Sequence, residues 1–412
     1  MAAPTTERAL AADEHASSPP HAAIVIGILF LIFFLGNSDN QMMSPLLPLI
    51  AREFGSTEGA VGRLIFPAYA LSAALAALVI GPLSDRYGRR RFLMYGSIVF
   101  GASLVSIRVI SSPVMLASLR IFTGLAAGTF STCSTAYVGV YFPYKRRGVA
   151  MSVVQSGLFA ALVVGVPVAN ILAGRGGWRL SFEAFGAIAL VAFALVLLAL
   201  PEDKQHAADS FASSERRFGH ARIVFETRER LASIFAAFFV SAGFVGFFSY
   251  LGSWLKQRLA FSTNDINLTF ALIGVALFLG VVVGGPVSDR FGKRGLSVAS
   301  TVVLAAMLFL IPGLGRGVGL YAILLTAALA FALRQGPLQA LATELVPRNA
   351  RGTLVAARNT ASQIGIAAAT VVCGTLFDRV GYGGVGIFSG AMSLGAAICI
   401  LLMTEPRGTS TE

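Results

Sequence analysis

The chain is divided into apolar runs, each near the ~20 residues that an α-helix needs to cross a bilayer. They lie at 22–45, 62–83, 92–110, 114–141, 149–172, 180–200, 232–255, 267–287, 296–314, 318–342, 353–377 and 383–403. The runs are continuously apolar, whereas the strands of a membrane barrel alternate apolar and polar residues over about ten positions. Only 13% of the residues are charged, against about 25% in soluble domains. The sequence therefore predicts an all-α membrane protein with twelve transmembrane helices.

The basic residues predict how these helices are oriented. With the N-terminus placed inside, 20 of the 32 Lys and Arg residues fall in inner loops and tails, and eight fall in outer loops. The positive-inside rule then places both termini in the cytoplasm. We expect a multi-pass protein of the plasma membrane, the inner membrane of a bacterium. Because topology accounts for the net charge of +12, we expect the lipid bilayer and no nucleic acid as a partner.

The sequence lacks the residues that several kinds of protein chemistry require. The three cysteines lie in apolar runs and the four histidines lie outside them, which predicts neither a disulfide framework nor a metal site. The sequence has no Gly-rich phosphate loop followed by Lys-Ser or Lys-Thr. We therefore expect neither ATP-driven transport nor an enzyme, and no bound cofactor.

Two segments recur at a spacing of 204 residues. GPLSDRYGRR at 81–90 matches GPVSDRFGKR at 285–294, and 143–148 matches 347–352 in the same register. Parallel repeats of this kind build one class of transporter, in which the substrate site lies near the bilayer midplane between the halves. The expected divisions are a tail (1–21), a six-helix bundle (22–200), a cytoplasmic linker (201–231), a second six-helix bundle (232–404) and a tail (405–412).

These repeated residues carry a family resemblance. The 81–90 segment resembles the loop 2–3 signature of the major facilitator superfamily, and 285–294 resembles its loop 8–9 counterpart. Arg120–Gly124 is similar to motif B of that superfamily, and Gly177–Phe182 resembles its drug:proton antiporter and sugar-efflux-like branches. The resemblance covers about 22–405. It implies a major facilitator fold of two pseudo-symmetric six-helix bundles that transport by alternating access, and we expect a monomer.

The loop signature also predicts a conformational latch. Asp85 can pair with an arginine across the loop and lie near the positive end of a neighbouring helix. Gly81 and Gly88 permit close helix approach and a tight turn. The expected latch residues are Gly81, Asp85, Arg86, Gly88, Arg90, Asp289 and Arg290. The alternative is that the loop arginines only fix the topology.

Asp39 is the only acidic residue well inside a predicted span, and such a residue indicates function by default. If span one ends near Pro45, Asp39 and Arg120 each lie ~9 Å below the outer end of their spans. In the antiporters that the chain resembles, a first-span acid and the motif B arginine form a proton-coupling pair. The alternative is a static ion pair that fixes helix packing.

Polar residues in the second half predict a substrate site. Arg334 lies near the middle of span ten, whereas Arg358 lies ~8 Å inside span eleven and could extend its charge to the interface. The expected substrate-binding residues are Arg334, Arg358, Gln155, Gln335, Gln339, Asn359, Gln363 and Asn40. Polar contacts between helices are the alternative role for the amides. The excess of arginine over aspartate in the spans favours an anionic or neutral polar small molecule over a lipophilic cation.

The sequence therefore predicts a secondary active transporter. The leading function is proton-coupled efflux of a small organic molecule or drug, with the proton as the coupling ion. One alternative is proton-coupled uptake of an organic anion or carboxylate. A non-transporting membrane receptor on the same fold is the other.

Overall fold

The computed structural model describes residues 21–202, 225–347 and 350–404, and the regular elements within these ranges are all helices. The first half of the chain forms α2 (Ala22–Glu53), α3 (Glu58–Tyr87), α4 (Arg89–Val105), α5 (Pro113–Tyr141), α6 (Tyr144–Gln155), α7 (Gly157–Ala160) and α8 (Val166–Ala199). The second half forms α10 (Arg228–Gln257), α11 (Thr263–Phe291), α12 (Lys293–Leu310), α13 (Val318–Leu333), α14 (Gln335–Glu344), α15 (Arg351–Val380) and α16 (Tyr382–Leu401). The second bundle thus begins at Arg228, four residues before the expected boundary. Nearly all of the expected tails and most of the expected linker lie outside the described residues.

Within the described ranges, 11 helical stretches are long and apolar enough to cross a membrane. One of them, Arg146–Ala199, has 54 residues and would be about 80 Å long if straight, against a bilayer core of about 30 Å. Its backbone leaves the helical conformation at Gly176 and Gly177, where φ of Gly177 is +81°. A glycine is suited to that left-handed conformation because it has no Cβ. This turn divides the stretch into spans five and six, so the described residues contain the twelve expected spans.

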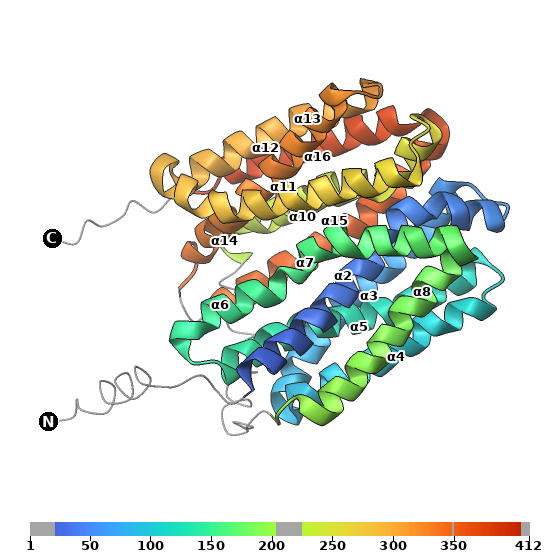
Figure 1. Ribbon diagram of the computed structural model, residues 1–412. Helices are drawn as coiled ribbons and strands as arrows, with labels where there is room; N and C mark the ends of the chain where they lie inside the picture. The colour runs from blue at the N-terminus through green and yellow to red at the C-terminus, as the bar shows by residue number, and fades with distance from the viewer. Residues whose placement is uncertain (1–20, 203–224, 348–349, 405–412) are drawn as a thin grey trace, which may run out of the picture.

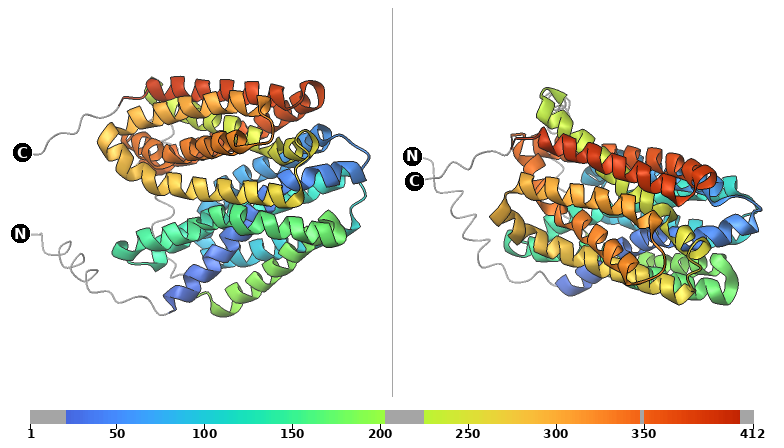
Figure 2. Two further views of the ribbon diagram at one scale, coloured as in Figure 1. Left: turned by 45° about the horizontal axis from the view of Figure 1, so that its top comes forward. Right: turned by 90° about the horizontal axis from the view of Figure 1, so that it is seen from above.

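The helices form two bundles, α2–α8 and α10–α16, that lie side by side (Figures 1 and 2). The end of the molecule where α2 begins and α16 ends is called here the terminal end. The opposite end, which carries the α2–α3, α10–α11 and α15–α16 connections, is called the distal end. The bundles meet where α2 packs on α10, α3 on α15, and α7 and α8 on α11. Residues of both bundles therefore surround the central axis.

The repeat found in the sequence is visible in the backbone. Gly88 and Gly292 are 204 positions apart, and both adopt positive φ, +93° and +79°, immediately before α4 and α12. At the centre, the Ser44 hydroxyl donates a hydrogen bond of 2.8 Å to the Phe248 carbonyl, and these residues are also separated by 204 positions. A residue that contacts its own repeat equivalent lies next to the pseudo-two-fold axis. That axis therefore passes through the α2–α10 contact.

The first span is longer than the sequence suggested. Helix α2 continues through Pro45 and Pro48 to Glu53, and its contacts with α10 satisfy polar groups near these prolines. The expected end near Pro45 was wrong. Asp39 lies about 21 Å from the true end of α2 by helical rise, so the equal-depth argument for its partner rested on an incorrect helix end.

Candidate functional site

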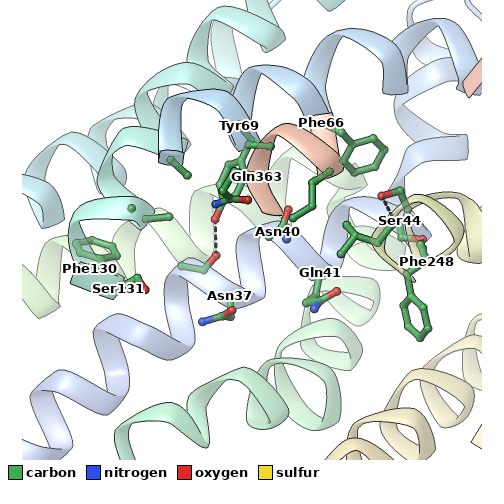
Figure 3. A pocket seen from close by; sticks show the side chains of 18 of the residues that line it. Asn37, Asn40, Gln41, Ser44, Phe66, Tyr69, Phe130, Ser131, Phe248 and Gln363 are labelled. Atoms are coloured by element: carbon green, nitrogen blue, oxygen red, sulfur yellow. Dashed lines mark hydrogen bonds between the residues drawn. The ribbon is translucent and has the colours of Figure 1, made fainter. Parts of the chain in front are cut away.

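A pocket of about 210 Å³ lies between the two bundles. Its polar lining comes mainly from α2, where Asn37, Asn40 and Gln41 share one helix face at i, i+3 and i+4 (Figure 3). The remaining residues come from α2, α3, α5, α10 and α15, and they are Phe33, Gly36, Ser44, Phe66, Tyr69, Ala70, Ala73, Ala127, Gly128, Phe130, Ser131, Val245, Phe248, Ser249, Gln363 and Ile366. Amides, hydroxyls and aromatic rings line this pocket, and none of its lining residues carries a formal charge.

A second pocket, of about 540 Å³, continues toward the terminal end. It shares Ser131 and Gln363 with the first pocket, and its lining extends along α5 to Ala136 and along α15 to Gly352. Both of these positions are close to the terminal end of their helices. The two pockets therefore form a path between the bundles that leads from the centre to the terminal end.

The distal end, in contrast, is closed by hydrogen bonds between the bundles. Asn170 on α8 donates to Asn267 on α11 at 2.6 Å, and the Gly252 amide of α10 donates to the Ser44 hydroxyl at 3.1 Å. Asp378 on α15 accepts from residues at the start of α3. Among the described residues, all hydrogen bonds between the bundles lie in the distal half. The structure is therefore a distal-closed state.

The Asp39–Arg120 pair lies next to the central pocket, inside the first bundle. Nη1 of Arg120 on α5 donates to both carboxylate oxygens of Asp39 on α2, each at 2.6 Å. Both residues are fully buried. Nε and Nη2 of Arg120 have no hydrogen-bond partner among the described residues. The expected pairing is present, and one carboxylate compensates the charge of a guanidinium that keeps further hydrogen-bonding capacity.

Tyr69 on α3 separates this ion pair from the pocket. The guanidinium carbon of Arg120 lies 4.4 Å from the centre of the Tyr69 ring, a distance typical of a cation–π contact. The Tyr69 hydroxyl donates to the Gly36 carbonyl at 3.0 Å, shown as the dashed line beside Tyr69 in Figure 3. Because Tyr69 also lines the pocket, a molecule in the pocket can touch a side chain that touches Arg120.

The two arginines of the second bundle lie away from both pockets. Arg334, between α13 and α14, is fully buried, donates to Thr301 at 3.1 Å and stacks on Phe331. Arg358 on α15 is buried and donates to Gln339 at 2.7 Å. Neither arginine is in an ion pair among the described residues. Both are placed by contacts inside the second bundle.

The amide side chains that were predicted to bind substrate lie in different parts of the structure. Asn40 and Gln363 line the central pocket, and Asn359 lines the second pocket. Gln155 and Gln335 are exposed and line neither pocket. The structure therefore brings Asn40, Gln363 and Asn359 along one path and leaves the other amides outside it.

The predicted latch residues lie at the terminal end. Arg89, which follows the turn at Gly88, pairs with Asp85 at 2.6 Å. Arg90 donates to the Leu197 carbonyl at the end of α8 at 2.6 Å. Arg86 stacks on Tyr87, and Asp289 and Arg290 are exposed. A Cβ at Gly81 would lie 3.6 Å from the Thr132 side chain, an ordinary contact, so the close helix approach expected at Gly81 is absent.

The sequence reasoning missed several residues of the site. Asn37 and Gln41 could have been found, because with Asn40 they form a polar face on an otherwise apolar helix. Tyr69 carried no such signal, since it is one of nine tyrosines in the chain and its role depends on the contact with Arg120. The distal contacts of Glu58 and Asp378 depend on the packing of α3 against α10 and α15.

Comparison with known proteins identifies a family that matches this chain. The model of the Major Facilitator Superfamily matches residues 29–370. The probable 4-methylmuconolactone transporter of Cupriavidus pinatubonensis is 30% identical over 92% of this chain and 89% of its own length. The chloramphenicol resistance protein of Streptomyces lividans is 29% identical over 73% of this chain and 75% of its own. The crystal structure of a D-xylose–proton symporter superposes with a TM-score of 0.73 at 20% identity, covering 93% and 98% of the two chains.

Proposed function

Because this chain belongs to the major facilitator superfamily and is a multi-pass membrane transporter, we propose that it exports a small, uncharged polar organic molecule in exchange for protons. The Asp39–Arg120 pair, which lies behind Tyr69 at an uncharged pocket, is the observation that supports this proposal most strongly. The pocket offers amides and hydroxyls for hydrogen bonds and aromatic rings for stacking. It offers no fixed charge that would hold an ion.

In an alternating-access cycle, the Asp39–Arg120 pair couples substrate binding to proton binding. The distal-closed state loads substrate from the terminal end through the second pocket. A substrate that stacks on Tyr69 holds that ring against Arg120, and Arg120 then stays on Asp39. Because a buried carboxylate is stable as an anion only while a cation stays close, Asp39 takes up a proton only after the substrate has left and Arg120 moves away. Substrate and proton thereby exclude each other, as exchange requires.

The predicted orientation and one relative support export as the direction of transport. The positive-inside rule assigns the terminal end to the cytoplasm, so the distal-closed state opens inward, in the plasma membrane of a bacterium. A relative named for chloramphenicol resistance supports export, because removal of a drug from the cell protects against it.

Reconstituted protein tests this proposal. In proteoliposomes with an imposed proton gradient, wild type should move chloramphenicol, used as an uncharged polar probe, against its concentration gradient. Asp39→Asn should abolish this uphill flux and retain exchange of chloramphenicol at equal concentrations, because the pocket is intact. Glu183→Gln is the matched control, since this acid contacts Arg108 within the first bundle. Uphill flux by Asp39→Asn at the wild-type rate would contradict the coupling role.

Proton-coupled uptake of an organic anion is the second candidate, and the buried arginines favour it. Nε and Nη2 of Arg334 have no hydrogen-bond partner among the described residues. From Arg334, a stack of Phe331, Phe244 and Phe248 leads to the central pocket, with ring centres 3.6 Å and 4.5 Å apart. Benzoate should then accumulate along with protons in wild type, and Arg334→Gln should weaken benzoate far more than chloramphenicol. Equal losses for both probes would count against anion binding by Arg334.

A further inference from the structure

Two acidic residues lie at the closed distal end, where α3, α10 and α15 meet. Asp378 on α15 is well satisfied. It accepts from the Gly59 amide at 3.0 Å and the Thr57 hydroxyl at 2.8 Å, and it pairs with Arg63 at 3.4 Å. These contacts join α15 of the second bundle to the start of α3 in the first.

Glu58, the first residue of α3, has a different environment. It is 6% exposed, and one carboxyl oxygen accepts from the Gln257 amide of α10. The other oxygen, Oε2, is also buried, and the Ser253 hydroxyl of α10 is its neighbouring donor. Among the described residues, Glu58 forms no ion pair. Its carboxyl group is therefore held between the bundles by neutral groups alone.

The charges around Glu58 do not compensate for this burial. Asp378 faces it from α15 and repels a negative charge, whereas Lys256 faces it from α10 without forming an ion pair. Glu58 and Arg52 of α2 both line a pocket at the distal end, and Arg63 is paired with Asp378. The amino end of α3 favours an anion. A buried carboxylate without a paired cation is nevertheless costly, and its contacts with Gln257 and Ser253 are with neutral groups.

Protonation removes the cost of the buried charge. A proton on Oε2 makes this oxygen a donor to the Ser253 hydroxyl, which can accept as well as donate. The Gln257 contact remains, because Oε1 is still an acceptor. We propose that Glu58 is a proton-binding site that is filled when the bundles close at the distal end and emptied when they separate there. The proton comes from the medium at the distal end, and opening exposes Glu58 to water and returns it.

This inference rests on the alternating-access part of the proposed function and is independent of Asp39. It implies that low pH favours the distal-closed state. If the closed state holds one proton more than the open state, the closed-to-open ratio rises about tenfold for each unit of pH lowered. The dependence ends below the pH at which Glu58 is protonated in the open state as well.

Spin-label distances in the purified full chain test the proposal without substrate or gradient. Labels at Val109→Cys and Val380→Cys, which are 75% and 67% exposed on different bundles, report the distal separation once the three native cysteines are replaced. Between pH 8 and pH 5, wild type should shift from long to short distances. Glu58→Gln should stay at short distances at every pH, because glutamine is permanently neutral.

Two further variants separate the explanations. Glu183→Gln, a neutralised acid within one bundle, should keep the wild-type pH response. Ser253→Ala should keep a response with its midpoint at higher pH, since the hydroxyl that donates to the carboxylate is lost. The flux of Asp39→Asn tests the coupling role by a separate readout. A pH response that persists in Glu58→Gln, a wild type without a pH response, or a response to Na⁺ at constant pH would each overturn the proposal.

Discussion

The contact on the pseudo-two-fold axis gives a direct test of rocking. A Cβ added at Gly252 on α10 would lie 2.6 Å from Cα and 2.7 Å from N of Pro45 on α2. These are backbone atoms and cannot rotate away, so Gly252→Ala must push the bundles apart at the distal end. The distal-open state separates α2 from α10 and is free of the clash. The substitution therefore acts on the equilibrium between the two states.

The size of the effect follows from the cost of overpacking. An extra methyl group in a close-packed contact costs about 1–3 kcal/mol, which corresponds to a change of about 5- to 150-fold in the ratio of the two states. The labels at Val109 and Val380 should report this as a larger population at long distance. Gly139→Ala on α5 is the matched control, because no atom lies within 4 Å of the added Cβ. An unchanged distance distribution in Gly252→Ala would refute the assignment of this contact to the closed state.

Three other substitutions have defined expectations. Tyr69→Phe removes the hydrogen bond to Gly36, worth about 1 kcal/mol, and should lower the number of protons exchanged per chloramphenicol, measured as paired fluxes. Asp85→Asn breaks the pair with Arg89, which is already formed within the first bundle in the distal-closed state. A pair of this kind is worth at most about 1 kcal/mol, so the ratio of short to long spin-label distances should change by no more than about fivefold. Arg334→Ala leaves a cavity beside Phe331 and Thr301 and should lower the thermal unfolding temperature by several degrees in detergent.

Much of the fold could be predicted because the bilayer imposes helix length and polarity. The twelve runs and the turn at Gly88 follow from local patterns. The pairing of Asp39 with Arg120 was expected from the family resemblance and from an equal-depth argument, and only the resemblance survives the observed end of α2. The end of α2 could not be predicted in the same way. Prolines usually end a helix, but α2 continues through Pro45 and Pro48. It contacts α10 here through the Ser44 hydroxyl, and contacts with residues 204 and 208 positions away leave no local signal.

The site shows the same limit. Asn40 and Gln363 were identified from their polarity inside apolar spans, and both line the pocket. Arg334 has the same signal and lies away from both pockets, on the far side of Phe331. Polarity within a span indicates that a side chain needs partners. It does not indicate whether those partners are a substrate or a neighbouring helix, because that depends on how the helices are rotated.

The contact between Ser44 and Phe248 has a consequence for how the two halves can diverge. In a symmetric dimer of identical six-helix units, the residue beside the two-fold axis meets its own copy, and every substitution there appears on both sides of the interface. Joining the units in one chain removes this constraint. One position now carries a hydroxyl donor and its equivalent a phenyl ring that lines the pocket, so a fused pair can make an asymmetric binding site on a symmetric frame.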